Sequence, residues 1–338
     1  MERLIYLPGM NEITMAEMLI TNKIDMAFSL TAANLKLVQQ QNPKIVVSLK
    51  HPPYGYLDWW PIGLGFNDSI PPFTDPEIRW AISYALNRKQ IVQYAFDGYN
   101  DPTALPFPTY PPLMKYLNSV KDLLQKYPSG EFNPTKTEQI MTKKGYKKGS
   151  DGMWADSSGK KLSFQIITFP QHPSCTPQAP VVTEQLRQAG FDASFLLPAD
   201  FATRIFTGEA HAFLWGHGGS MIDPYRTLNL YNSRYYVPTG KPAYTNIYRW
   251  KNQAFSNVVD EMGRLPVGAP EVEGLFRKAM EIWLPNLPDV QTTQTVINVP
   301  MNETYWTNWP LGNKPYTPPS FWHRTGGVLM FTHLQPVQ

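Results

Sequence analysis

Residues 189–228 read "AGFDASFLLPADFATRIFTGEAHAFLWGHGGSMIDPYRTL", and this stretch decides which fold the chain is expected to adopt. It predicts a strand over 191–197, a short helix over 199–207 and a second strand over 211–215, after a helix over 180–189 that Gly190 closes. A glycine-rich loop then leads through Asp-Pro into a further helix. Because strands that alternate with helices indicate a parallel or mixed sheet covered by helices, the stretch predicts an α/β fold.

Helix-start signals recur on the amino-terminal side of this stretch. Asp75 precedes Pro76 and Asn133 precedes Pro134, so each pair places a capping residue before a proline at the first helical position. The first of these helices is expected to continue through "PEIRWAISYALNRKQIVQYAF". The other expected elements are strands over 1–7, 24–30 and 44–50, helices over 13–25, 252–264 and 270–284, a hairpin with its turn at 156–159, and an apolar terminal strand, "GGVLMFTHL", over 326–334.

Composition narrows the classes of function. With 338 residues, 42% of them apolar and 17% charged, the chain is expected to be globular with a sizeable core. A net charge of +3 spread over this length provides no basic face, which argues against a nucleic-acid partner. No stretch approaches the roughly 20 apolar residues that span a bilayer. The single Cys175 has no His or Cys at metal-ligand spacing, so neither a metal nor another cofactor is expected.

The sequence offers one loop that could belong to a hydrolase. His-Gly-Gly-Ser at 217–220 is similar to the glycine-rich loops that supply oxyanion-hole N–H groups in some esterases. That chemistry also needs a G-x-S-x-G nucleophile elbow, which the chain lacks. It also has no H-E-x-x-H and no phosphate-binding P-loop, and "GLGFND" at 63–68 lacks the third glycine of a dinucleotide fingerprint. We therefore predict no catalytic residue, and a hydrolase that uses the His217 loop remains the alternative from another class.

The order of the segments resembles the family 5 extracellular solute-binding proteins of ABC importers, the dipeptide and oligopeptide type. The opening stretch carries the pattern at Leu186, Ala189-Gly190, Gly208, Trp215, Asp223-Pro224 and Leu228. The segment from 71 to 108 agrees at Phe73, Asp75, Arg79, Ala81, Ala85, Arg88, Ile91, Gly98 and Pro106. "MAEMLITNKIDMAFSL" keeps Asp25, although Asn22-Lys23 replaces the usual Gly-Glu. The resemblance covers nearly the whole chain in order.

The resemblance implies a two-lobe periplasmic-binding-protein-like fold (type II, cluster C) that closes on its ligand like a hinge. Residues 1–67 and 291–338 would form a partial lobe I, and 68–290 would form lobe II. The crossovers between the lobes would lie in 54–67 and 291–300. Members are considerably longer than this chain, which would begin where their first lobe is already well advanced, so we expect an incomplete lobe I.

The resemblance also implies a role and a location. The protein would be a non-enzymatic solute-binding component, with ABC permease subunits in the membrane as its partners. It would work in the periplasm or outside the cell, associated with the membrane through the transporter, and its signal peptide would not be in this chain.

Two ligand classes stay open. In peptide binders of the family, an Asp at the position of Asp223 pairs with the ligand's amino terminus, although Asp223 could instead cap the next helix. Peptide binders often carry a second acid between the Trp and the Asp-Pro, which is absent here, and the tail "ETYWTNWPLGNKPYTPPSFW" resembles an oligosaccharide-binding branch. Because sugars present flat CH faces to aromatic rings, we favour an oligosaccharide over a peptide. The predicted ligand contacts are Trp215, His217, Asp223, Tyr225, Trp59, Trp60, Tyr56, Trp306 and Trp309.

Overall fold

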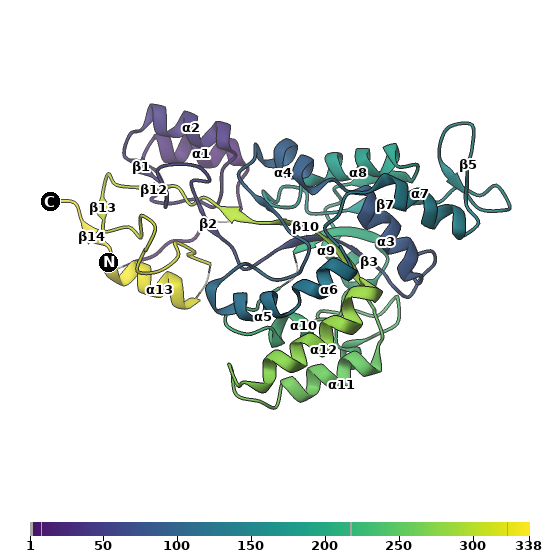
Figure 1. Ribbon diagram of the computed structural model, residues 1–338. Coiled ribbons are helices and arrows are strands. Elements are labelled where there is room, and N and C mark those ends of the chain that lie inside the picture. The colour runs from purple at the N-terminus through teal and green to yellow at the C-terminus, as the bar shows by residue number, and fades with distance from the viewer. Residues whose placement is uncertain (1–2, 8, 217, 323) are drawn as a thin grey trace. The chain divides into compact units, whose positions relative to one another are not determined.

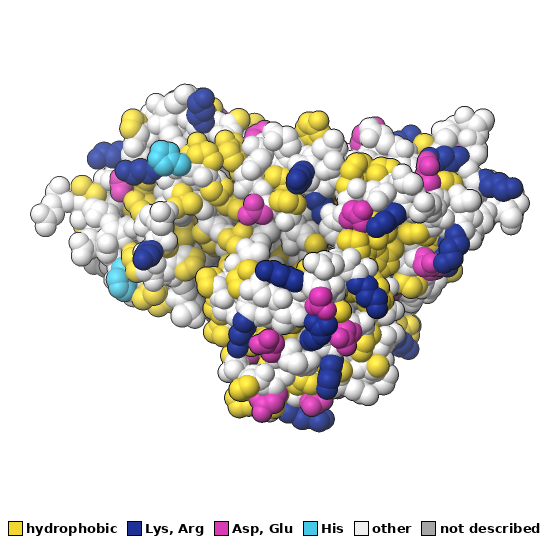
Figure 2. All heavy atoms as spheres, viewed as in Figure 1, with side chains coloured by type: hydrophobic (Ala, Val, Ile, Leu, Met, Phe, Trp, Pro, Cys, Tyr) yellow, Lys and Arg dark blue, Asp and Glu magenta, His cyan; other side chains and the backbone are white. Residues whose placement is uncertain are grey.

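The computed structural model describes residues 3–7, 9–216, 218–322 and 324–338. The chain divides into two compact units (Figure 1). Unit 1 comprises Met1–Asp58, Phe96–Asn100 and Val296–Gln338, and unit 2 comprises Trp59–Ala95 and Asp101–Thr295. On the face drawn in Figure 2, Lys and Arg side chains are scattered among Asp and Glu instead of gathering in one patch.

Unit 2 is built on a six-stranded mixed sheet. Its strands are β3 (Ile62–Phe66), β4 (Asp101–Pro102), β7 (Ser163–Ile167), β8 (Asp192–Leu196), β9 (Ala212–Gly216) and β10 (Asp289–Gln294). They lie in the order β4-β10-β3-β9-β7-β8. β7 runs parallel to β8 and β9, whereas β3 is antiparallel to both β9 and β10. The α/β fold expected from the opening stretch is therefore present, and the alternation over 180–216 is confirmed.

Helices cover this sheet. They are α3 (Pro76–Ala85), α4 (Arg88–Phe96), α5 (Met114–Ser119), α6 (Lys121–Lys126), α7 (Pro134–Lys143), α8 (Gln178–Gln188), α9 (Phe201–Thr207), α10 (Tyr225–Asn229), α11 (Gln253–Met262) and α12 (Glu271–Asn286), with short 3-10 turns at Pro111–Leu113 and Ser233–Tyr235. Both predicted caps are confirmed: Asp75 Oδ1 accepts from Glu77 N at 2.9 Å, and Asn133 Oδ1 accepts from Lys136 N at 3.1 Å.

One local prediction for unit 2 is wrong, and another is confirmed. The single helix expected over 76–96 is broken, because Leu86 is extended and buried and Asn87 then starts α4 by accepting from Gln90 N. The turn at 156–159 exists, with Gly159 N donating to Asp156 O at 2.9 Å. The segment after it folds back beside β6 (Trp154–Ala155) as the predicted hairpin, with an antiparallel bridge between Ala155 and Lys161, and then continues as β7 next to β8 and β9. The preceding segment forms a small ladder of its own between β5 (Lys147–Lys148) and β6.

Unit 1 has less regular structure. It contains α1 (Glu12–Ile20), α2 (Ala32–Gln41) and α13 (Arg324–His333). Its strands pair two by two: β1 (Ile45–Val46) with β12 (Met301–Asn302), β2 (Tyr56–Leu57) with β11 (Val296–Ile297), and β13 (Trp306–Thr307) with β14 (Gln335–Pro336). Its buried apolar residues form two small clusters, whereas unit 2 has one continuous core.

Three strand predictions for unit 1 are wrong. Residues 3–7 belong to no strand, and 24–30 contributes only a bridge between Met26 and Met301. The apolar terminal segment is mostly the helix α13, which buries Met330 in the core of unit 1 and packs Phe331 against it. Within the described ranges, no helix is long and apolar enough to cross a membrane.

The boundaries of the two units do not coincide with the predicted lobe boundaries, which lie between 67 and 68 and between 290 and 291. β3 and β10 pair with each other, with Leu64 opposite Val290, so both strands belong to the sheet of unit 2. The chain passes between the units inside 54–67 and 291–300, the two segments expected as crossovers, and again at Phe96–Asn100. The assignment of these units to lobes stays a prediction.

Candidate functional site

One edge of the unit 2 sheet brings several predicted site residues together. β7 and β9 are parallel and end at this edge, and β3 begins there because Ile62 pairs with Gly216. Three segments therefore emerge side by side: Trp59–Trp60 before β3, 168–177 after β7, and 218–224 after β9. We call this the carboxyl edge. In sheets with helices on their faces, such edges are where ligands commonly bind.

Half-buried aromatic rings gather at the carboxyl edge around Trp215. Phe169 stacks on Trp215 with ring centroids 4.7 Å apart and an interplanar angle of 18°, and Trp60 meets Trp215 edge to face at 5.7 Å. Phe201 and Phe206 from α9 each lie 5.9 Å from Trp215. With His172, these rings form what we call the aromatic cluster: Trp60, Phe169, His172, Phe201, Phe206 and Trp215. Beyond Phe206, the ring of Tyr244 is 74% exposed.

His172 adds polarity to the cluster without adding charge. Its ring lies 5.4 Å from Trp60 and 4.8 Å from Phe169. Burial among these rings lowers its pKa to about 4, so the imidazole is neutral at pH 7. Its Nδ1 accepts from Ser174 N at 3.2 Å, which fixes the ring's orientation. The cluster therefore presents an uncharged aromatic surface at neutral pH.

The glycines of the opening stretch are explained by the two tryptophans beside them. A Cβ on Gly216 would lie 2.0 Å from the Trp60 indole, and one on Gly218 would lie 2.7 Å from Trp59 O. A Cβ on Gly219 would likewise lie 2.7 Å from Arg226 Nε. Gly218 and Gly219 also have positive φ angles, 145° and 123°, which favour glycine. The loop thus needs glycines because its backbone packs directly against Trp59–Trp60.

The rest of this loop is tied to α10. Ser220 is buried, donating from its N–H to Thr227 Oγ1 and accepting through Oγ from Thr227 N. Asp223 lies before the N-cap residue Pro224, and its Oδ1 accepts from Tyr225 N, at the start of this helix, at 3.0 Å. The Tyr225 ring lies against Gly263, and its hydroxyl accepts from Arg234 at 3.3 Å. These contacts favour structural roles for Asp223 and Tyr225. His217 lies outside the described residues.

Trp59 differs from its neighbour in facing a cation. The Arg226 guanidinium lies 5.3 Å from the centre of the Trp59 ring, at a cation–π distance. The side chain of Arg226 is exposed, whereas Trp59 is half-buried. The carboxyl edge therefore combines an uncharged aromatic surface around Trp215 with one positive side chain at Trp59.

A buried polar layer holds the segment after β7 in place. Gln178 Nε2 donates to Ser174 O at 2.7 Å and to Thr293 Oγ1 at 3.0 Å, and its Oε1 accepts from Thr292 Oγ1 at 2.7 Å. Thr292 and Thr293 belong to β10, whose residues are all buried although most are polar. These bonds connect 168–177 to the sheet, so Phe169 and His172 are held by a satisfied network.

Sequence reasoning missed Phe169, His172, Phe201 and Phe206. Their one sequence signal is that Phe169 and His172 follow a predicted strand, which the structure shows to be parallel to the strand with Trp215. Parallel neighbours end at the same sheet edge. The position of α9 relative to Trp215 had no comparable local signal.

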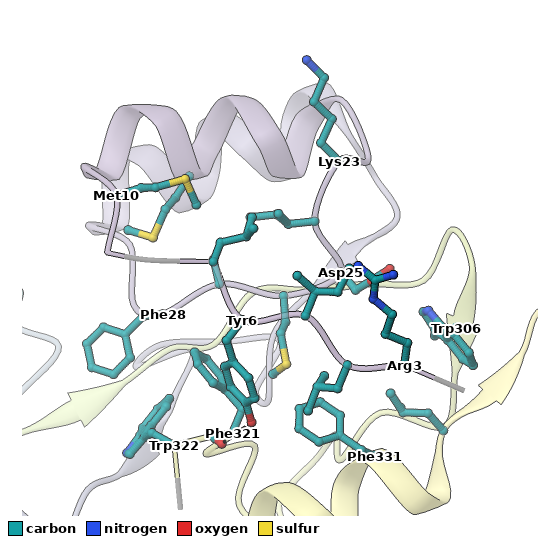
Figure 3. A pocket seen from close by; sticks show the side chains of 18 of the residues that line it. Arg3, Tyr6, Met10, Lys23, Asp25, Phe28, Trp306, Phe321, Trp322 and Phe331 are labelled. Atoms are coloured by element: carbon teal, nitrogen blue, oxygen red, sulfur yellow. Dashed lines mark hydrogen bonds between the residues drawn. The ribbon is translucent and has the colours of Figure 1, made fainter. Parts of the chain in front are cut away.

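Two of the three predicted residues in unit 1 line a pocket of about 510 Å³ within that unit (Figure 3). Trp306 and Trp309 line it, but Trp309 is only 5% exposed and its Nε1 donates to the carbonyls of Asn302 and Trp306. Trp309 is therefore a core residue of unit 1. Tyr56 stacks on Trp322 with centroids 6.4 Å apart. Across the described part of the chain, no group of three or more His, Cys, Asp or Glu side chains could hold a metal ion.

The chain is similar to known solute-binding proteins. Residues 1–237 match the family described as bacterial extracellular solute-binding proteins, family 5 Middle. The oligopeptide-binding protein AppA of Bacillus subtilis is 30% identical over 166 residues, 49% of this chain and 28% of AppA. A probable ABC transporter-binding protein of Deinococcus radiodurans is 32% identical over 119 residues, 35% of this chain and 19% of that protein. The matches thus span less than a third of these relatives' lengths.

Solved structures show the same fold at lower identity. A periplasmic oligopeptide-binding protein of an ABC transporter from Thermotoga maritima superimposes with a TM-score of 0.84 at 21% identity, covering 98% of this chain and 62% of that one. Its mannohexaose-bound form gives a TM-score of 0.83 at 22% identity, covering 98% and 61%. This chain therefore has the fold of the two-lobe binding proteins, and with 237 matched residues it belongs to the bacterial extracellular solute-binding proteins of family 5.

Proposed function

We propose that this protein is the solute-binding component of an ABC importer and that it captures an oligosaccharide at the carboxyl edge of unit 2. The aromatic cluster around Trp215 carries the proposal. Its rings are half-buried, adjoin the exposed ring of Tyr244, and carry no charge at neutral pH. Sugar rings stack their CH faces on such surfaces, and the neighbouring His172 and Ser220 loops add polar groups.

The comparisons support this choice without deciding it. The Thermotoga maritima relative is named for oligopeptides, and one of its structures holds mannohexaose. A fold that accommodates an oligosaccharide in a relative is compatible with the same ligand class here. Delivery to permease subunits in the membrane follows from the role of such importers, in the periplasm or outside the cell.

A peptide is the second candidate, and Asp223 favours it. This carboxylate lies at the position that the family resemblance connects with a peptide's amino terminus, and many relatives are named for peptides. Its Oδ1 already accepts from Tyr225 N, however, and this contact at the start of α10 is a sufficient structural role for it.

The hydrolase alternative finds less support. Ser220, the hydroxyl nearest to His217 in sequence, is 1% exposed and exchanges hydrogen bonds with Thr227. A nucleophile must reach its substrate and a base, and this hydroxyl is instead engaged in anchoring the loop. We therefore propose a non-enzymatic binding protein.

Ligand titrations separate these candidates. Calorimetry with mannohexaose, a cello-oligosaccharide series and a mixed peptide library would be carried out on the wild type and on Trp215→Ala. If a sugar binds, Trp215→Ala should weaken it by about 1–3 kcal/mol, roughly 5- to 150-fold. Trp154→Ala removes a buried indole from β6 of the same unit, so it reveals losses that come only from lower stability.

The variant Asp223→Ala tests for a peptide ligand. It should weaken sugar binding by no more than a neutral hydrogen bond, about 0.5–1.5 kcal/mol. Binding of peptides alone, abolished by Asp223→Ala and unaffected by Trp215→Ala, would refute the oligosaccharide proposal. Turnover of ester or glycoside substrates that disappears in Ser220→Ala would refute the non-enzymatic one.

A further inference from the structure

The aromatic surface of the carboxyl edge continues beyond Trp215 along α9. Phe206 of this helix meets Trp215 edge to face, with ring centroids 5.9 Å apart and an interplanar angle of 72°. Phe206 also meets Tyr244 edge to face, at 5.2 Å and 60°. Tyr244 belongs to residues 239–247, which precede α11 and which we call the Tyr244 segment. The three side chains therefore form a row of rings, each in contact with the next.

Backbone hydrogen bonds fix the Tyr244 segment to the end of α9. Gly240 N donates to Thr207 O at 2.7 Å, and Ala243 N donates to Phe206 O at 2.8 Å. Carbonyls at the end of a helix have no partner within the helix, so these bonds satisfy groups that would otherwise need water. Because Ala243 is buried and directly precedes Tyr244, the fold sets the position of Tyr244 beside Phe206.

Arg249 holds the same two elements together from the interior of unit 2. It is only 1% exposed, and a Cβ on Gly208, at the end of α9, would lie 2.4 Å from its Cζ. A cation is favourable beside the carbonyls of a helix C-terminus. The guanidinium donates at 2.6–3.4 Å to four backbone carbonyls, two of α9 and two of the Tyr244 segment: Ile205 O, Phe206 O, Lys241 O and Ile247 O.

We propose that Tyr244 is a specificity-determining residue that makes the site prefer long oligosaccharides to short ones, and that Arg249 is the positioning residue for Tyr244 and Phe206. The inference rests on the proposed function, because it assumes that a sugar stacks on Trp215. A single sugar ring covers about one aromatic side chain, so only a longer chain reaches Tyr244 as well. Tyrosine suits this role because its rigid ring stacks on CH faces while its hydroxyl bonds to sugar hydroxyls.

Calorimetry with the series from cellobiose to cellohexaose, and with mannohexaose, tests the role of Tyr244 in the full chain. The quantity measured is the gain in affinity from the shortest sugar that binds to the hexaose. Tyr244→Ala should reduce this gain about 3- to 10-fold and leave the affinity for the shortest sugar unchanged. Tyr244→Phe keeps the ring and should retain most of the gain. Tyr94→Ala, which removes a ring of α4 that is 71% exposed, is the matched control and should leave the gain unchanged.

Arg249→Lys tests the positioning role. Lysine keeps the charge but lacks the planar fork that reaches four carbonyls, so the gain in affinity should fall as it does in Tyr244→Ala. Adding Tyr244→Ala to Arg249→Lys should then reduce the gain no further, because both changes remove the same contact. Arg88→Lys alters another buried arginine that donates to backbone carbonyls, those of Ser83, Leu86 and Gln291, and controls for lower stability. It should leave the gain unchanged, and circular dichroism checks the folding of each variant.

The outcomes separate this inference from the proposed function. If no sugar of any length binds to the wild type, both are overturned. If sugars bind and Trp215→Ala weakens them, but Tyr244→Ala leaves the gain unchanged, the role of Tyr244 alone is refuted. If Tyr244→Ala reduces the gain but Arg249→Lys weakens all sugars equally, Arg249 acts only on stability and its positioning role is refuted.

Discussion

Replacing Asp289 should change how the stability of unit 2 depends on pH. Asp289 is fully buried at the start of β10, where it accepts from Tyr231 OH at 2.8 Å and from Gln291 Nε2 at 2.6 Å. Asp68 is also buried, and Arg79 lies 3.6 Å from it. Burial raises the pKa of Asp289 to about 7, against the partly offsetting hydrogen bonds from Tyr231, Tyr248 and Gln291 and the charge of Arg79.

The sign and size follow from proton linkage. Between its ordinary pKa of 3.8 and about 7, the folded state holds a proton on Asp289 that the unfolded chain has lost. The stabilisation is therefore fully present below pH 4 and is lost as the pH rises through 7. The whole shift of about 3 pKa units corresponds to about 4 kcal/mol, of which about 3 kcal/mol falls between pH 5 and pH 8.

Urea unfolding followed by tryptophan fluorescence at pH 5 and pH 8 measures this effect. In Asp289→Asn the carboxyl no longer titrates, so the free energy of unfolding of the wild type minus that of the variant should fall by about 3 kcal/mol between the two pH values. Taking the difference cancels the titration of groups that do not interact with Asp289, whereas Asp68, whose pKa the charge of Asp289 also raises, contributes to it. Glu138→Gln, which removes an exposed acid of α7, is the control and should show no such fall. A difference that stays constant or rises with pH would refute the assignment of a raised pKa to Asp289.

Three further changes test the carboxyl edge. His172→Asn should act with the opposite sign, because burial lowers the pKa of His172 from 6.5 to about 4. The stabilisation from the neutral imidazole is present above pH 6.5 and is lost as the pH falls through 4. In urea unfolding, the free energy of unfolding of the wild type minus that of His172→Asn should therefore rise by about 3 kcal/mol from pH 4 to pH 7. Gly216→Ala should destabilise unit 2 by about 1–3 kcal/mol, because the new methyl group meets the Trp60 indole, whereas Gly274→Ala in α12, which has open space, should be neutral or stabilising by up to about 1 kcal/mol; equal thermal shifts would contradict this. Asp223→Ala should lower stability by about 1 kcal/mol through loss of the hydrogen bond from Tyr225 N at the start of α10, and an unchanged midpoint in urea would contradict this.

Much of unit 2 could be predicted from the sequence because its signals are local. Asp75-Pro76 and Asn133-Pro134 start helices through hydrogen bonds that reach only two or three residues along the chain. Gly190 ends α8 with a positive φ, and the alternation over 191–216 indicated the strands around it. Where local signals were ambiguous the prediction failed: "GGVLMFTHL" is apolar enough for a strand, and the helix α13 results from the packing of Met330 and its neighbours in unit 1.

The candidate site was only half visible in the sequence. The sequence alone determined that Trp215 ends a strand and that a glycine-rich loop with an Asp-Pro follows it. Only the tertiary structure decided which aromatic residues surround Trp215, because Phe169 reaches it through the order β3-β9-β7 and Phe201 through the placement of α9. It also decided that Trp309 is core and that Asp289 is buried. Contacts between residues far apart in sequence depend on how sheets and helices pack, and no run of neighbouring residues encodes them.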